Sequence, residues 1–404
     1  MKRKKEYNSL DEKLYKELRM AFNASPIFSN YDKYKDKYNL CCAVMDRIET
    51  SVKYLNSHMQ YPFAEEPDLV TFVVYACMLV DGVKVLYERV FHESAYNKEK
   101  KYFIHAQQQR FLNLQEEDYI DDDKFFEYFR SVVFAHPYNT DRTFKNIYGS
   151  QVSPYVLCGY TPVNLLGEIS DPIGAKIYTS KERRNGGDII LLEVSFRQFI
   201  NYLNSRYNKL FKVIEWLKKE KIETEEKWKN EKIYASDNPI LTLLDISRVL
   251  NERLMTNYGV NQLLYYLSCK ISNLDNEKLI EIYRGKIIER IPDIINAVNL
   301  LDEERIDEII YELTRSPDNV KGEHYYQLEK IYSYLHESDE IIKPIESSNE
   351  EWGLIQADKF SKGFASKWVN INAYNMPTSE IKLLVAVACY FENHKKEYSY
   401  LIKK

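Results

Sequence analysis

Glycine and proline are scarce in this chain, with 12 of each among 404 residues. Because these two residues interrupt helices, their shortage predicts a mainly α protein. The six cysteines contain no Cys-x-x-Cys pair, which excludes a disulfide framework and the common zinc sites. The longest apolar run, Leu69 to Val80, is too short to span a bilayer and predicts a buried helix. No apolar segment follows the basic residues after Met1, so we expect a cytoplasmic protein without a membrane partner.

Most catalytic signatures are also missing. The paired glycines Gly186 and Gly187 lack the Lys-Ser/Thr of a phosphate-binding loop, and no Gly-x-Ser-x-Gly occurs. His92 lacks the second histidine of a zincin helix. Asp121 and Asp123 have the Asp-x-Asp spacing of some metal sites, but acidic residues there fit a helix start better. We therefore expect neither a metal nor a cofactor.

The charge of the chain is unevenly distributed. The formal net charge is −5, which argues against a surface coated with phosphate-binding groups. Residues 275–351 hold 20 acidic and 9 basic residues, so the remainder is mildly basic. We interpret this acidic segment as a cover for a basic site or as the binding site of a regulatory protein partner.

The spacing of apolar residues predicts two helical regions around a small sheet. Apolar residues recur at helical spacing to about residue 135 and again after Ser195. Between about 150 and 195 the period changes to two and β-branched residues are frequent, which predicts an inserted β-hairpin or three-stranded sheet. Ser195 is expected to open one long helix. Further helix starts are expected at Asn276, Glu303, Asp318 and Thr378. We divide the chain into a helical bundle with the β insertion, 1–235, and a C-terminal all-α region, 236–404.

One short motif stands out at the end of an amphipathic helix. Arg130 is followed by Ser131 and, six positions after the arginine, by His136; a polar run that includes Asn139 comes next. Arginine stays charged and binds phosphate through two parallel hydrogen bonds, and histidine exchanges protons near neutral pH. Together these residue types suit cleavage of a phosphodiester without a metal.

The motif and its helical surroundings resemble the HEPN superfamily of helical bundles, whose signature is an arginine, four to six residues and a histidine. The resemblance implies a metal-independent endoribonuclease of the toxin or antiviral-defence type, with RNA as substrate and tRNA as one candidate. It implies a homodimer in which two motifs share one cleft. Arg130 would hold the phosphate and His136 would act as acid or base, with Ser131, Asn139 and His92 as auxiliary residues.

A purely structural interpretation of the same residues stays open. His136 continues the apolar row of Phe125 and Phe129, so it is also typical of a core histidine. Arg130 is spaced to pair with Glu127 on the helix surface. A histidine at a helix end, such as His92, is often a capping contact. On this interpretation the protein is a non-catalytic helical scaffold that dimerises or binds a nucleotide or a protein partner.

Overall fold

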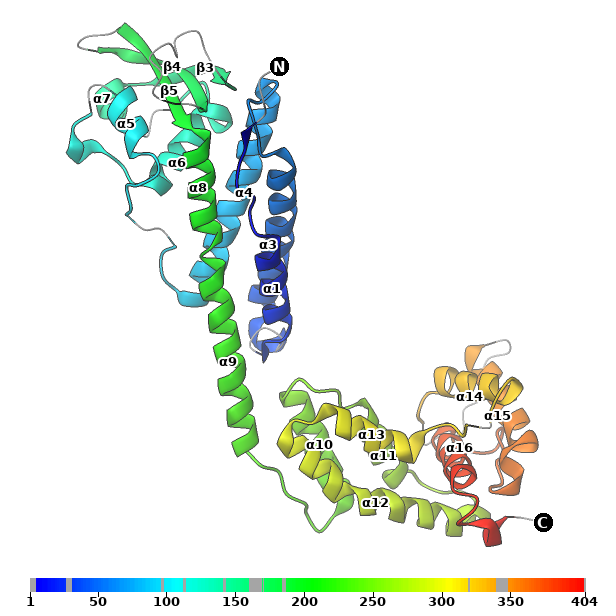
Figure 1. The fold of residues 1–404 in the computed structure, drawn as a ribbon. Coiled ribbons are helices and arrows are strands. Elements are labelled where there is room, and N and C mark those ends of the chain that lie inside the picture. The colour runs from blue at the N-terminus through cyan, green and yellow to red at the C-terminus, as the bar shows by residue number, and fades with distance from the viewer. Residues whose placement is uncertain are drawn as a thin grey trace. The chain divides into compact units, whose positions relative to one another are not determined.

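The computed structural model describes residues 5–26, 31–95, 98–111, 114–140, 143–159, 169, 171–183, 187–318, 320–338 and 348–402. The chain forms two compact units, 1–222 and 223–404, each with its own hydrophobic core. The division falls inside helix α9, Leu210–Asn230, whereas the sequence analysis placed it at 235/236. The predicted fold class is confirmed: the chain is mainly helical, with a small three-stranded antiparallel sheet in the middle of the sequence (Figure 1).

Unit 1 is a helical bundle with the sheet at one end (Figure 1). Helices α1, α3, α4 and α8 run side by side along the bundle. A short ribbon of strands β1 and β2 joins the N-terminal segment to the α3–α4 connection. The helices of this unit before the sheet are α1 (Glu12–Asn23), α3 (Tyr31–His58), α4 (Glu66–Phe91), α5 (Ile104–Arg110), η1 (Glu116–Asp118), α6 (Asp122–Arg130), η2 (Ser131–Ala135) and α7 (Lys145–Tyr148), and β1 and β2 are Lys5–Glu6 and Gln60–Tyr61.

Helix α4 lies at the centre of this bundle. It contains the apolar run Leu69 to Val80, and Leu69, Phe72 and Leu79 have no exposed surface. By length and composition α4 is also apolar enough to cross a membrane. In unit 1 its apolar faces are covered by α3, α6 and α8, as the sequence predicted for a buried helix.

The inserted sheet contains three antiparallel strands in the order β3-β4-β5: Gln151–Leu157, Pro172–Arg183 and Gly187–Ser195. Alternate residues of β4, such as Ile173 and Ile177, are buried against the helices. The other face of the sheet is more exposed. Residues 160–168, 170 and 184–186 of the predicted insertion lie outside the described part of the chain.

Ser195 caps the next helix, as predicted, and its hydroxyl accepts a hydrogen bond from the Gln198 backbone. The expectation of one continuous helix is wrong, because α8 (Phe196–Tyr207) ends before α9 begins at Leu210. No glycine or proline marks this break. At the break, the ammonium of Lys209 donates a hydrogen bond to the carbonyl of Ala95, so a contact with a segment distant in sequence lies where the helix is interrupted.

The elements of unit 2 that the structure describes are all helices. Of these, α16 (Thr378–Asn393) is the most buried, with every residue from Thr378 to Glu392 buried. Helices start as predicted at Glu303 and Thr378, and Asn276 directly precedes α12. The predicted start at Asp318 is wrong, because the next helix begins only after Gly322, whose φ of 60° suits glycine. The remaining elements are α10 (Pro239–Glu252), α11 (Tyr258–Ser268), η4 (Leu274–Asn276), α12 (Glu277–Leu300), α13 (Glu303–Thr314), α14 (Glu323–Tyr334), α15 (Asn349–Gly363), η5 (Ala365–Lys367) and η6 (Ser399–Leu401).

Candidate functional site

A surface pocket of about 370 Å³ lies where α6, the turn after it and the loop toward α7 meet. Four of the residues selected from the sequence line it: Arg130, Ser131, His136 and Asn139. Five further residues complete the wall: Glu127, Tyr128, Ala135, Thr140 and Thr143. The last two residues of the predicted polar run, 141 and 142, lie outside the described residues. The pocket is therefore built almost entirely from the motif itself and the loop that follows it.

The helix changes its geometry between the arginine and the histidine. Helix α6 ends at Arg130, and Ser131–Ala135 form a π-helical turn. The His136 backbone N–H closes this turn by donating to the Ser131 carbonyl at 2.8 Å. Pro137 then prevents continuation, because the residue before a proline is disfavoured in helical conformation. Single π turns often occur at functional sites, and this one places Arg130 and His136 at its two ends.

Arg130 is held from the side by α4. Its guanidinium lies 3.4 Å from the carboxylate of Asp81, and both side chains are partly exposed. Burial lowers the pKa of Arg130, but the interactions with Cys77, Asp81 and Glu127 raise it by more than burial lowers it. The net pKa is therefore above the usual value, and the side chain stays charged. Burial raises the pKa of the Cys77 thiol to about 12, which leaves it protonated and a poor nucleophile.

Arg130 forms an ion pair with Asp81 of helix α4, and the nearby charge of Glu127, the partner expected from the sequence, also raises the pKa of the arginine. The core-histidine interpretation is wrong, because His136 is exposed. Its backbone is fixed: the His136 carbonyl accepts hydrogen bonds from the Thr140 hydroxyl at 2.7 Å and the Asn139 N–H at 3.2 Å. Within the described part of the chain, no hydrogen bond occupies its imidazole.

Strand β3 anchors the loop that carries the histidine. The Thr140 N–H donates to the Gln151 carbonyl at 3.0 Å, and the Ser153 N–H donates to the Pro137 carbonyl at 2.6 Å. The buried amide of Gln151 accepts from the Tyr128 hydroxyl at 2.5 Å and donates to the Thr143 carbonyl at 2.8 Å. Gln151 thus joins two walls of the pocket. Sequence analysis missed it, because a glutamine beside a turn is typical of a solvent-exposed residue.

His92 does not line this pocket. It is the residue that ends α4, with a φ of 53°, and it is exposed. It lies eleven positions after Asp81, roughly 16 Å along the helix at 1.5 Å per residue. Its backbone N–H donates to the Glu88 carbonyl at 2.9 Å, which caps the helix. The geometry gives His92 a helix-end position and no contact with the motif.

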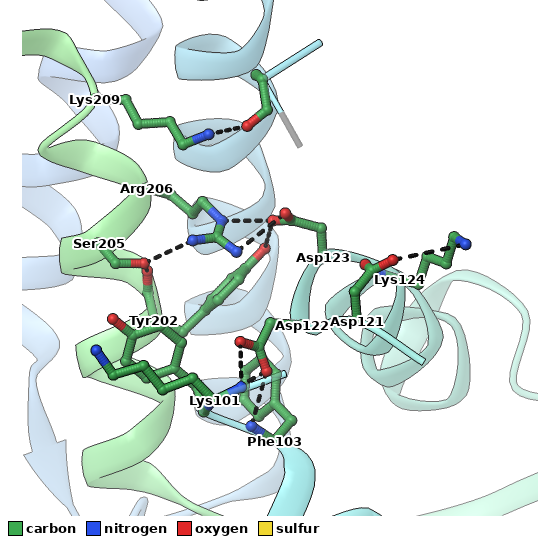
Figure 2. Close-up of polar contacts among 12 residues, drawn as sticks. Lys101, Phe103, Asp121, Asp122, Asp123, Lys124, Tyr202, Ser205, Arg206 and Lys209 are labelled. Atoms are coloured by element: carbon green, nitrogen blue, oxygen red, sulfur yellow. Dashed lines mark hydrogen bonds and ion pairs between the residues drawn. The ribbon is translucent and has the colours of Figure 1, made fainter. Parts of the chain in front are cut away.

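The three aspartates at the start of α6 have structural partners (Figure 2). Asp121 caps the helix by accepting from the Lys124 N–H. Asp122 accepts from three successive backbone N–H groups at residues 101–103. Asp123 is buried and accepts two hydrogen bonds from Arg206, at 2.6 and 3.0 Å, and one from the Tyr202 hydroxyl. Across the described ranges, no cluster of three histidine, cysteine, aspartate or glutamate residues is arranged to hold a metal ion.

We compared the chain with protein-family models, with curated proteins and with solved structures, and none of them matches. The chemistry of the pocket therefore has to follow from its own residues. It offers one fixed cation, one exposed imidazole and several hydroxyl and amide groups from Ser131, Asn139, Thr140 and Thr143. This set suits a ligand that carries both a phosphate and hydrogen-bonding groups.

Proposed function

We propose that this protein is a metal-independent endoribonuclease of the HEPN type that acts as a dimer. One observation carries the proposal: Arg130 and His136 lie at the two ends of a single π turn and line the same pocket. The charged guanidinium suits a phosphate, and the exposed imidazole suits proton transfer. Both residues are fixed by elements distant in sequence, through Asp81 and through β3.

The reaction assigned to this site is attack of the ribose 2′-oxygen on the adjacent phosphorus. A base removes the 2′-hydroxyl proton, the bond from phosphorus to the 5′-oxygen breaks, and an acid gives a proton to that leaving oxygen. The products are a 2′,3′-cyclic phosphate and a free 5′-hydroxyl. Arg130 stabilises the charge that develops on the non-bridging phosphate oxygens, and His136 moves one of the protons.

A single copy of the motif provides one imidazole for two proton transfers. Two copies facing each other across a two-fold axis provide two imidazoles and two guanidinium groups, as the HEPN resemblance implies. A shared cleft has a kinetic consequence. Adding excess His136→Ala protein to the wild type should lower the activity per wild-type chain, whereas a self-contained site in each chain would leave it unchanged.

Expression in growing cells separates the nuclease from a scaffold. We expect the wild-type protein to arrest growth and the His136→Ala variant to be tolerated at equal abundance. His105→Ala is the matched control, because His105 is an exposed histidine of the same unit that does not line the pocket. It should arrest growth like the wild type. Equal tolerance of all three proteins would favour the alternative, a non-catalytic helical protein that binds a nucleotide or a protein partner.

A further inference from the structure

The outer face of the sheet carries Tyr178 of β4, and a bulge in strand β3 places Tyr155 on the same face. Val152 pairs with Tyr178 of β4, but Tyr155 pairs with Lys176, so two residues of β3 oppose one residue of β4. Residues three apart on a regular strand point to opposite faces. The extra residue in the bulge shifts the alternation of side chains, so that both Val152 and Tyr155 lie on the exposed face. Tyr155 is 59% exposed, so its ring is open to a ligand.

A lysine lies between the two tyrosines. The Lys176 ammonium is 5.9 Å from the centre of the Tyr155 ring and 5.1 Å from the centre of the Tyr178 ring. No carboxylate of the described residues forms an ion pair with it. A cation without an acidic partner, placed among aromatic rings on an open sheet, combines the two features by which proteins hold single-stranded nucleic acid: stacking and attraction to phosphate.

Strand β3, which carries Tyr155, borders the pocket. Gln151, the first residue of β3, is hydrogen-bonded to Thr140 of the pocket wall, and Val152 on the outer face is the next residue. The sheet also packs against the π turn, through β3 and β4. From Gln151 to Tyr155 the strand extends roughly 13 Å at 3.3 Å per residue. Because β3 is an edge strand of the sheet, RNA that leaves the pocket across this edge would reach the tyrosines with its next nucleotides.

We propose that Tyr155, Lys176 and Tyr178 form a platform on which unpaired RNA bases stack beside the cleavage site. This inference rests on the proposed function and specifies its substrate as single-stranded RNA. Bases inside a duplex are already stacked on one another, so their faces are closed to the tyrosines. Single-stranded segments, such as loops and unpaired ends, present free base faces and flexible phosphates to the platform.

The test is RNA binding by the His136→Ala protein, which keeps the labelled probe intact. Fluorescence anisotropy with a single strand of about 12 nucleotides reports the Kd. Tyr155→Ala and Tyr178→Ala should each weaken binding roughly five- to hundredfold, because each removes one stacking partner. Tyr155→Phe should bind like the parent, since stacking needs the ring and not the hydroxyl. Lys176→Gln should lower the slope of log Kd against log salt concentration by about 0.7.

Two controls make the result specific. Tyr258→Ala removes a tyrosine that is 75% exposed in unit 2 and should leave the Kd unchanged. A duplex of the same sequence should bind more weakly and should not respond to Tyr155→Ala. Unaltered single-strand binding in both alanine variants would overturn the inference. So would a change in oligomeric state with no change in RNA affinity, which would make this face a contact between copies of the chain.

The binding assay and the cleavage assay test the platform and the nuclease separately, so either proposal can be rejected without the other. Tyrosine-dependent RNA binding without any cleavage by the wild type would support the platform and reject the nuclease. Cleavage that depends on His136 but not on the tyrosines would support the nuclease and reject the platform.

Discussion

The hydroxyl of Tyr128 donates a hydrogen bond of 2.5 Å to the side-chain oxygen of Gln151, and both groups are buried under the candidate site. Burial raises the pKa of Tyr128 far above its usual value, so the hydroxyl remains a donor at every relevant pH. Gln151 in turn donates to the Thr143 carbonyl. This pair connects α6, which carries Arg130, with the loop that follows His136.

We expect Gln151→Leu to destabilise the protein and to lower kcat. It leaves the Tyr128 hydroxyl and the Thr143 carbonyl without this partner, at about 1 to 3 kcal/mol for each buried polar group that stays unpaired. Tyr128→Phe removes one bond only and should have the smaller effect on both quantities. Chemical denaturation gives the stability and RNA cleavage gives kcat and KM. A positioning role predicts a loss in kcat with little change in KM; an unchanged kcat in the folded variant would contradict it.

If Arg130 binds phosphate as proposed, we expect its ion pair with Asp81 to compete with the substrate. The pair is partly exposed, so it is worth about 0.2 to 1 kcal/mol. Asp81→Asn frees the guanidinium and removes a negative charge near a polyanion, and it should therefore lower the KM for RNA by up to about fivefold. The effect should be greatest at low salt, where charges are screened least. A higher KM at low salt would show that Asp81 serves the substrate by orienting Arg130 and does not compete with it.

The buried pair of Asp123 and Arg206 should be essential for folding of unit 1. Asp123→Asn removes the carboxylate that accepts two hydrogen bonds from Arg206, and breaking a buried ion pair from one side costs about 3 to 5 kcal/mol. The matched control is Asp121→Asn, because asparagine caps a helix as well as aspartate does and the change should cost less than about 0.5 kcal/mol. Urea unfolding measures both. Equal stability of the two variants would show that the pair contributes little.

Stability of unit 2 should depend on pH through Glu337. Burial raises the pKa of this carboxyl, but the hydrogen bond and the charge of Lys382 lower it more, so the folded-state pKa lies below the usual 4.5. A depressed pKa stabilises the fold above pH 4.5, and this contribution disappears as the pH falls through the folded-state value. The Tm difference between the wild type and Glu337→Gln should be constant near neutral pH and shrink in acid. A difference that grows in acid would contradict this sign.

The sequence predicted those features that depend on neighbouring residues. Ser195 caps α8 as local chemistry predicts, and α13 and α16 begin at Glu303 and Thr378, where the sequence placed helix starts. Arg130 and His136 are six positions apart at a helix end, so their shared pocket also follows from local geometry. The three strands were predictable because the spacing of apolar residues changes there from a helical period to a period of two.

The remaining features depend on contacts between distant segments. Asp81 meets Arg130 from another helix, and Gln151 reaches Tyr128 from the sheet. The bulge that exposes Tyr155 requires the pairing register of β3 with β4, which a single strand does not reveal. The break between α8 and α9 has no local signal either. Spacing rules describe one element at a time, and they carry no information about which elements meet.

The most direct measurement is cleavage of total RNA and tRNA by the purified protein in excess EDTA, with analysis of the product ends. The account predicts fragments that end in 2′,3′-cyclic phosphate. Their rate of formation should fall by about 100- to 10,000-fold in His136→Ala and by about 100- to 1,000-fold in Arg130→Ala, while His105→Ala cleaves normally. Absence of cleavage by the folded wild-type protein, or cleavage that survives both substitutions, would contradict the assignment of this pocket as a ribonuclease site.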